Sequence, residues 1–483
     1  MSILDFERRV SEIRPHGAGL SVDLYSPDLG ELLEALDRHQ LSVDYLEIFK
    51  GSVRGLQEIR RKRSDLPLVY HAEGLWVTQP DLNDAYPLES ELQATASQVA
   101  AIGASWLTHE CATKQMAGYT FGTYLPPLLS LAGAEATADN IRIVQARIDT
   151  LLRGLNCLRP LFLLETPPLT YFGFGDLDMA EFFTAITDRV ACGVVLDIGH
   201  LWTIYRYTGA WQRSSVEAFL LEFLNRFPLE RVVQIHVAGL GVHQTVAQTV
   251  AGHGQVPVEP PLWLDAHEQS IPAVLFDLLE QVLQQPRLVN LRGVALEVDN
   301  KPVPCIVGEF ERFTQRFRPM IGQRLRSEAI STARTTHPAS VEGTSRPGDH
   351  TEMRVRKQEL IEKYRSYASA VSRPSAIPAA TSCSQGLELY RQYYLPHEIL
   401  TWGGDLSQMF PVTCQALQEA GTSLEDFLSF WFREPRWSHD RFDFFLLKVD
   451  RFVSFVTEVL PDGLPTAQRE AESLREAYAI ACG

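Results

Sequence analysis

Histidines and carboxylates stand at the ends of apolar, strand-like runs along much of this chain. The runs are LVYHAE, SWLTHE, LFLLET, VVLDIGH, VVQIHVAG and GVALEVD, and LDAHE follows the fifth of them. A buried ionisable side chain is costly unless it is paired or binds a metal. The pattern therefore predicts a metal centre, and its candidate ligands are His71, His109, Glu165, Asp197, His200, His236, Asp265, His267 and Glu297.

Each of these residues also has a common role without a metal. A single strand-end histidine is usually only hydrogen-bonded. Asp197 and Asp265 each suit the start of a helix as an N-cap, and Glu165 alone fits half of a buried ion pair. The combination favours metal binding. Because one ion usually takes three or four protein ligands, nine candidates indicate two or three ions.

The donor types narrow the choice of metal. Imidazole and carboxylate donors without cysteine suit iron, manganese or zinc rather than copper(I) or an iron–sulfur cluster. Asp265 and His267 lie two positions apart in LDAHE, a spacing that lets one ion bind both. We therefore expect a multinuclear site built from histidines and carboxylates.

Short apolar runs alternate with longer amphipathic stretches, such as ESELQATASQVAAIG, over residues 17–300. Strands that alternate with helices predict parallel βα units, and this span suits a TIM-like (β/α)8 barrel of the α/β class. In such a barrel the chemistry lies at the carboxyl ends of the strands, which is where the candidate ligands fall. The expected strands are 17–24, 43–49, 66–72, 105–111, 160–166, 192–198, 231–237 and 292–298.

A second, smaller domain is expected after the barrel. Residues 323–350 are rich in Ser, Thr, Pro and Gly and show no apolar periodicity, which predicts a flexible linker. Residues 351–483 return to helical periodicity with many aromatic residues. We expect a metal-binding barrel at 1–322, a linker at 323–350 and an all-helical domain at 351–483.

Composition excludes several classes of function. The chain of 483 residues has a net charge of −16, so it lacks the basic field of a nucleic-acid-binding protein. We find no apolar run of the ~20 residues that span a bilayer, and no signal-peptide pattern. The seven cysteines are scattered and form no C-x-x-C pair. We expect a cytoplasmic protein without a membrane or nucleic-acid partner.

At these motifs the chain resembles the multinuclear non-haem iron-dependent oxidative enzymes, the family that includes the methanobactin-type peptide oxidases. The resemblance covers roughly residues 15–320 and rests on the order of the motifs. The matching segments are LVYHAEGL, WLTHE, LFLLETPPLTYF, VVLDIGHLW, VVQIHVAGL, WLDAHEQSIPAVLFDLL and VALEVDN. The chain departs from the common family pattern with Glu165-Thr166-Pro167 in place of ENP, Gly199-His200 in place of an Asn-Asn pair, and DAHE in place of Asp-Thr-His-Gly.

The resemblance implies a TIM-like barrel that holds two or three iron ions, in mixed Fe2+ and Fe3+ states, and uses O2 as co-substrate. The substrate that it implies is a cysteine-containing, ribosomally synthesised precursor peptide, which the enzyme modifies by oxidation. On the same resemblance we expect Glu165, Asp197 and His200 to act in catalysis, with Glu165 bridging two ions.

Members of this family generally act with a partner protein that recognises the precursor peptide. The segment LELYRQYYLPHEILTWGGDLSQMFPVTCQAL resembles the helical part of such partners at Tyr390-Arg391 and Phe410-Pro411. A fused peptide-recognition domain is one interpretation of residues 351–483, with a separate recognition protein as another possibility. A helical bundle whose aromatic residues only form its core is the third.

Two other classes of function fit parts of the pattern: a xylose-isomerase-like metalloenzyme and a non-catalytic scaffold. Sugar isomerases and phosphodiesterases of the xylose-isomerase-like class also line a barrel mouth with His, Asp and Glu. A phosphodiesterase should carry basic residues near these motifs, and the acidic balance disfavours it. A sugar isomerase would work without O2, and a non-catalytic metal-binding or peptide-binding scaffold would consume none.

Overall fold

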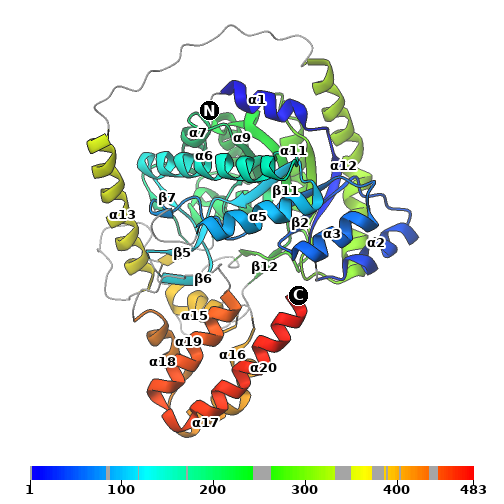
Figure 1. The fold of residues 1–483 in the computed structure, drawn as a ribbon. Coiled ribbons are helices and arrows are strands. Elements are labelled where there is room, and N and C mark those ends of the chain that lie inside the picture. The colour runs from blue at the N-terminus through cyan, green and yellow to red at the C-terminus, as the bar shows by residue number, and fades with distance from the viewer. Residues whose placement is uncertain are drawn as a thin grey trace.

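A closed barrel of parallel strands forms the centre of the molecule (Figure 1). The computed structural model describes residues 3–24, 26–82, 88–117, 119–169, 172–242, 263–331, 350–372, 386–387, 390–401, 404–433 and 444–482. Around the barrel the strands follow the order β1-β14-β11-β10-β8-β4-β3-β2, which confirms the predicted TIM-like fold. The barrel strands are β1 (Gly17–Asp23), β2 (Tyr45–Phe49), β3 (Leu68–His71), β4 (Trp106–Glu110), β8 (Leu161–Glu165), β10 (Gly193–Asp197), β11 (Val232–Val237) and β14 (Gly293–Glu297).

Each expected strand contains one observed barrel strand. The reason is burial on both faces: β3, β4, β8, β10, β11 and β14 are buried at every position. Parallel strands with one face toward the barrel interior and the other toward helices are apolar along nearly their whole length. The polar residue that ends such a run is therefore visible in the sequence.

Helices surround the barrel on its outer side (Figure 1). Several of them begin with side-chain caps, as α7 does where Asp178 and Glu181 form a capping box. The surrounding helices are α2 (Leu29–Arg38), α3 (Val53–Lys62), α5 (Leu88–Ile102), α6 (Leu131–Gly154), α7 (Met179–Thr187), α8 (Ile198–Tyr207), α9 (Val216–Arg226), α11 (Ala273–Leu283) and α12 (Val303–Ser331).

The amino-terminal end of the barrel is closed by α1 (Ile3–Glu12). Phe6 and Val10 of this helix belong to the apolar cluster that fills the barrel interior, together with Tyr45 and Trp106. The ring of Tyr45 needs close backbone approach: a Cβ at Gly19 would lie 2.4 Å from it. This end of the barrel is a packed core, and the chemistry is left to the other end.

Short strands extend the loops at the carboxyl end of the barrel. They follow β4, β8 and β11 directly, and each lies in a two-stranded sheet. The pairs are β5 (Thr113–Met116) with β6 (Tyr119–Leu125), β7 (Leu128–Leu129) with β9 (Phe174–Gly175), and β12 (Leu240–Val242) with β13 (Trp263–Asp265).

The carboxyl-terminal segment is helical, as expected. Its helices from α15 onward gather beside β5, β6 and β12, at the opposite end of the barrel from α1 (Figure 1). Among the described residues, no helix combines the length and the apolar character that a bilayer crossing needs. The helices are α13 (His350–Ser372), α15 (Leu395–Leu400), α16 (Leu406–Met409), α17 (Pro411–Glu419), α18 (Leu424–Trp431), α19 (Phe444–Val459) and α20 (Leu464–Cys482), with a π-helix at Tyr390–Tyr394.

Aromatic side chains attach this helical segment to the barrel loops. Trp431 donates its indole N–H to the carbonyl of Thr120 on β6 over 2.6 Å. Tyr367 donates its hydroxyl to the carbonyl of Pro126 over 2.9 Å. The rings of Phe432 and Phe121 lie 5.6 Å apart. The helical segment therefore packs against the loops that follow the barrel strands.

The predicted boundary between the two parts differs in detail from the structure. Helix α12 continues to Ser331, past the expected end of the barrel at residue 322. Residues 332–349 of the expected linker lie outside the described residues. The hydrophobic core runs from the barrel into the helical segment, because Tyr364 and Phe427 belong to the same buried cluster as Leu20.

We expect His16, at the amino-terminal end of the barrel, to make stability depend on pH. Its ring stacks on Trp106 at 4.7 Å, and burial and the charge of Arg292 lower its pKa from 6.5 to about 4. The native ring stays neutral where the unfolded chain takes up a proton. Stability should thus be lost as pH falls from 6.5 toward 4. Between pH 7 and 4.5 the free energy of unfolding of His16→Phe, measured with denaturant, should fall by about 2 kcal/mol less than that of the wild type.

The control for this measurement is His39→Gln, since His39 is exposed at the end of α2. Its pH dependence should match that of the wild type. Equal pH dependence in His16→Phe and the wild type would show that His16 makes no such contribution.

Candidate metal centre

The pleat of the barrel strands directs the strand-end residues inward. Side chains two positions apart in a strand point to the same side. Val69, Leu163, Val195 and Ala295 belong to the cluster inside the barrel. The residues two positions after them therefore also point inward, at the carboxyl end: His71, Glu165, Asp197 and Glu297.

Glu165 lies at the centre of this site. Its side chain is 1% exposed, and its two oxygens face different histidines. Oε2 lies 3.0 Å from Nε2 of His71, and Oε1 lies 2.8 Å from Nδ1 of His236. Since one oxygen points to each side, Glu165 has the geometry of a bridging carboxylate.

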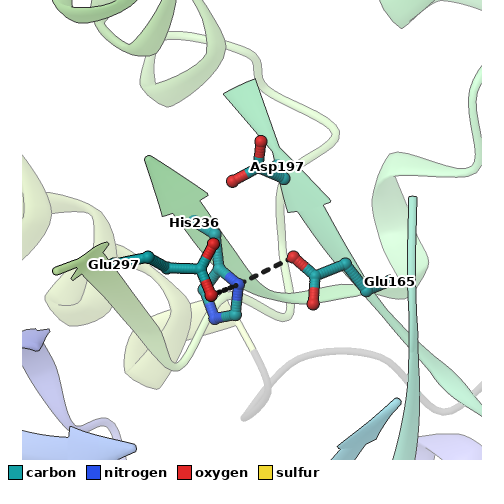
Figure 2. A group of neighbouring side chains, drawn as sticks. All are labelled: Glu165, Asp197, His236 and Glu297. Carbon is teal, nitrogen blue, oxygen red and sulfur yellow. Dashed lines mark hydrogen bonds and ion pairs between the residues drawn. The ribbon is translucent and has the colours of Figure 1, made fainter. Parts of the chain in front are cut away.

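One group of possible metal ligands consists of Glu165, Asp197, His236 and Glu297 (Figure 2). Each residue offers an atom within 4.8 Å of the others, and all four are buried. His236 Nδ1 lies 3.3 Å from Oε1 of Glu297. Figure 2 shows the four side chains converging from neighbouring strands of the barrel. Three carboxylates and one imidazole suit a divalent or trivalent cation.

A second group shares Glu165 with the first. It contains His71, Glu110 and Glu165, again with ligand atoms within 4.8 Å of one another. Glu110 is not among the ligands predicted from the sequence. Alternate residues of a strand share a face, so Glu110 points the same way as Trp106 and Thr108. Both of those residues contact Gln234 inside the barrel, and Glu110 therefore points inward too.

His109 lies on the opposite side of β4 from Glu110. Its Nδ1 is 2.8 Å from the carbonyl of Glu110, and its Nε2 accepts a hydrogen bond of 3.1 Å from the backbone N–H of Leu75. Among the described residues His109 belongs to neither of the two groups. The structure thus places His109 at the margin of the site.

A further set of side chains lies beside the first group, with His200 in the first turn of α8 and Asp265 and His267 on the loop after β11. Nε2 of His200 and Nε2 of His267 point to the same oxygen of Asp265, at 3.3 and 3.2 Å. Nε2 of His267 also lies 3.6 Å from Glu297, and its Nδ1 lies 3.0 Å from Asp299. This arrangement brings together the predicted pair Asp265 and His267 with His200, and it adjoins the first group through Glu297.

Thr166 and His200, at which the chain departs from the common family motifs, contact one another. Thr166 accepts a hydrogen bond from Nδ1 of His200 at its carbonyl, and its hydroxyl accepts one of 3.1 Å from the backbone N–H of Asp197. Asp197 is also the N-cap of α8, where Oδ1 accepts from the N–H of His200 over 2.6 Å. The cap occupies one oxygen of Asp197 and leaves Oδ2 for another partner.

Several buried carboxylate oxygens in this region have no hydrogen-bond partner among the described residues. Such atoms are costly in a protein interior, and a bound cation would satisfy them. They are Glu47 Oε1, Glu110 Oε2, Asp197 Oδ2, Asp265 Oδ1 and Asp299 Oδ1. The residues present therefore fit a metal ion.

The pKa shifts in this cluster indicate an excess of negative charge. Burial raises the pKa of Asp197 to about 6, although His200 opposes the shift. Burial likewise raises the pKa of Glu297 to about 7 against the effect of His236 and His267. Burial alone lowers the pKa of His71, yet the hydrogen bond and charge of Glu165 raise it to about 9. Without a cation, protons must balance the charges of this cluster.

These residues lie within a segment that a known family shares. The model of the family described as "RiPP precursor modification enzyme MbnB/TglH/ChrH" matches residues 24–315, which include the barrel from β2 to β14. The chain belongs to this family. Its members modify precursors of ribosomally synthesised, post-translationally modified peptides, and the chain is accordingly an enzyme of precursor-peptide modification. The match ends before the helical segment.

Curated relatives are similar at low identity. The UPF0276 protein of Caulobacter sp. (strain K31) is 25% identical over 279 residues, 57% of this chain and 87% of that protein. The UPF0276 protein of Haemophilus influenzae is 24% identical over 316 residues, 62% of this chain and 94% of its own length.

Among solved structures, endonuclease IV from Thermus thermophilus is 17% identical with a TM-score of 0.37, covering 64% of this chain and 99% of that chain. D-Psicose 3-epimerase from Clostridium cellulolyticum is 11% identical with a TM-score of 0.34, covering 66% of this chain and 98% of that chain.

Proposed function

We propose that this enzyme is a multi-iron, O2-dependent oxidase that modifies cysteine residues of a ribosomally synthesised precursor peptide. The observation that supports it most is Glu165, whose carboxylate is shared by two groups of buried ligand-type side chains. A shared carboxylate holds two ions close enough to act on one substrate. Family membership supports a precursor peptide as the substrate.

The proposed ligands fall into three sets. Glu165, Asp197, His236 and Glu297 would hold one ion, and His71 with Glu110 and the second oxygen of Glu165 would hold another. His200, Asp265 and His267 would hold a third, because both imidazoles face one oxygen of Asp265. His109 precedes Glu110 on β4, and its Nε2 accepts a hydrogen bond from the N–H of Leu75. We propose that His109 joins the His71 set by exchanging this hydrogen bond for the ion.

When bound, the iron ions, in mixed Fe2+ and Fe3+ states, would supply the reaction of O2 with a substrate thiolate. The residues of the chain set the conditions for it. Burial of Glu165 and Asp197, at 1% and 0% exposure, excludes bulk water from the site. Asp197 fixes the start of α8 and so orients His200 toward Asp265. These features support the catalytic roles that we propose for Glu165, Asp197 and His200.

Metal content and O2 uptake test this proposal. The full chain, produced with iron and purified without air, should contain two or three iron ions. It should consume O2 only when a cysteine-containing precursor peptide is present, and the same peptide with Cys→Ser should give no uptake. One zinc ion per chain and no iron would contradict the proposal. Turnover of a sugar without O2 would favour an isomerase instead.

Substitution of two proposed ligands makes a second prediction. His109→Ala and Asp197→Ala should each lose iron and peptide oxidation together, because a lost donor leaves an ion short of ligands. Elemental analysis and mass spectrometry of the peptide measure both effects. Asp149→Asn is the control, since Asp149 is buried but pairs with Arg9 of α1 at the opposite end of the barrel. Full iron in either alanine variant would refute the ligand role of that residue.

We further propose that the helical segment recognises the precursor peptide as a fused partner domain. It packs through Trp431 and Phe432 on β6, in the loop that follows β4. Hydrogen exchange with and without the peptide should show slower exchange in α15–α19 when peptide is bound. Protection confined to the barrel would indicate that the helices only complete the core and that recognition lies elsewhere.

A further inference from the structure

Glu47 is a buried carboxylate that none of the proposed ligand sets contains. It lies in the middle of β2 and is 0% exposed. Its Oε2 is 2.6 Å from Nε2 of His236 and 2.6 Å from Nε2 of Gln234. Nδ1 of the same imidazole faces Glu165 and Glu297 in the proposed metal centre. His236 therefore connects Glu47 to that centre.

The orientation of Gln234 is fixed by a group that can only donate. The indole N–H of Trp106 donates to Oε1 of Gln234 over 2.8 Å. The amide nitrogen of Gln234 must then point the other way, toward Oε2 of Glu47 and, at 3.1 Å, toward the hydroxyl of Tyr45. Oε2 of Glu47 is thus an acceptor held in place by the packed interior of the barrel.

A fixed acceptor at this position selects one tautomer of the neutral His236 ring. Nε2 of His236 must donate to Glu47, which keeps a proton on Nε2. In a neutral ring Nδ1 then carries a lone pair, and it faces Glu165 Oε1 at 2.8 Å and Glu297 Oε1 at 3.3 Å. A lone pair opposite two carboxylate oxygens is repulsive, so Nδ1 needs either a second proton or a metal cation among these atoms.

We propose that Glu47 is a positioning residue that makes His236 an Nδ1 metal ligand and adds negative charge behind its ring. A carboxylate that accepts the second N–H of a ligating histidine fixes the ring and raises its basicity. The inference rests on the proposed function only in requiring a metal at Nδ1 of His236. The alternative is a core ion pair between Glu47 and His236 that has no effect on metal binding.

Titration of the metal-free full chain with Zn2+ alone tests the proposal. Glu47→Gln keeps an acceptor oxygen but removes the charge, and it should weaken binding about ten-fold. Glu47→Ala removes the acceptor too and should weaken binding toward 100-fold. Asp149→Asn, which removes a buried carboxylate at the opposite end of the barrel, should bind as the wild type does. Thermal unfolding of each metal-free variant checks that it folds.

Nitrogen-15 NMR of the histidine rings distinguishes a positioning role of Glu47 from a purely structural one. In the Zn2+-loaded wild type and in Glu47→Gln, His236 should carry its proton on Nε2 and show a metal-bound Nδ1. Glu47→Ala should lose this signature, and His236→Ala assigns it. Wild-type affinity in both Glu47 variants would overturn the inference while leaving the proposed function intact. A wild-type chain that binds no metal would overturn both.

Discussion

The burial of Glu165 between two histidines is the constraint on which the site depends. A carboxylate with 1% exposure needs partners, and it finds them on strands that are distant in sequence: His71 on β3 and His236 on β11. Only a closed barrel brings those strands to opposite sides of β8 with their ends at one level. The partners that this buried carboxylate needs are therefore available only in the closed barrel.

The two ends of the barrel differ in composition: one is an apolar core, and the other carries the ligand-type residues. At the amino-terminal end, α1 and the aromatic residues Tyr45 and Trp106 form a packed apolar core. At the carboxyl end, carboxylates outnumber the histidines that can balance them, and several of their oxygens lack partners among the described residues. Gln234 and Glu47 lie between the ends, and their hydrogen bonds connect Trp106 of the core to His236. A bound cation would stabilise the whole molecule, because it binds the folded chain and relieves this excess of charge.

The helical segment adds a component that the family match does not include. The match covers residues 24–315, and the helices from α13 onward lie beyond it. Aromatic contacts nevertheless join those helices to the strands that continue from β4, the strand that carries Glu110. The same core cluster includes residues of both parts. The helices thus pack on the barrel loops at the end where the site lies.

The sequence by itself determined the barrel and most of its ligand-type residues. Strands covered on both faces are apolar along their length, so a terminal His, Asp or Glu stands out, as His71, Asp197 and Glu297 do. Tertiary structure decided how these residues group. Glu165 became central because β8 pairs with β4 and β10 in a closed barrel, which no local pattern encodes. Tertiary packing also decided that Glu110, and not His109, faces the barrel interior, and it brought Glu47 to His236. Strand register and closure set those contacts, and both depend on residues far apart in the chain.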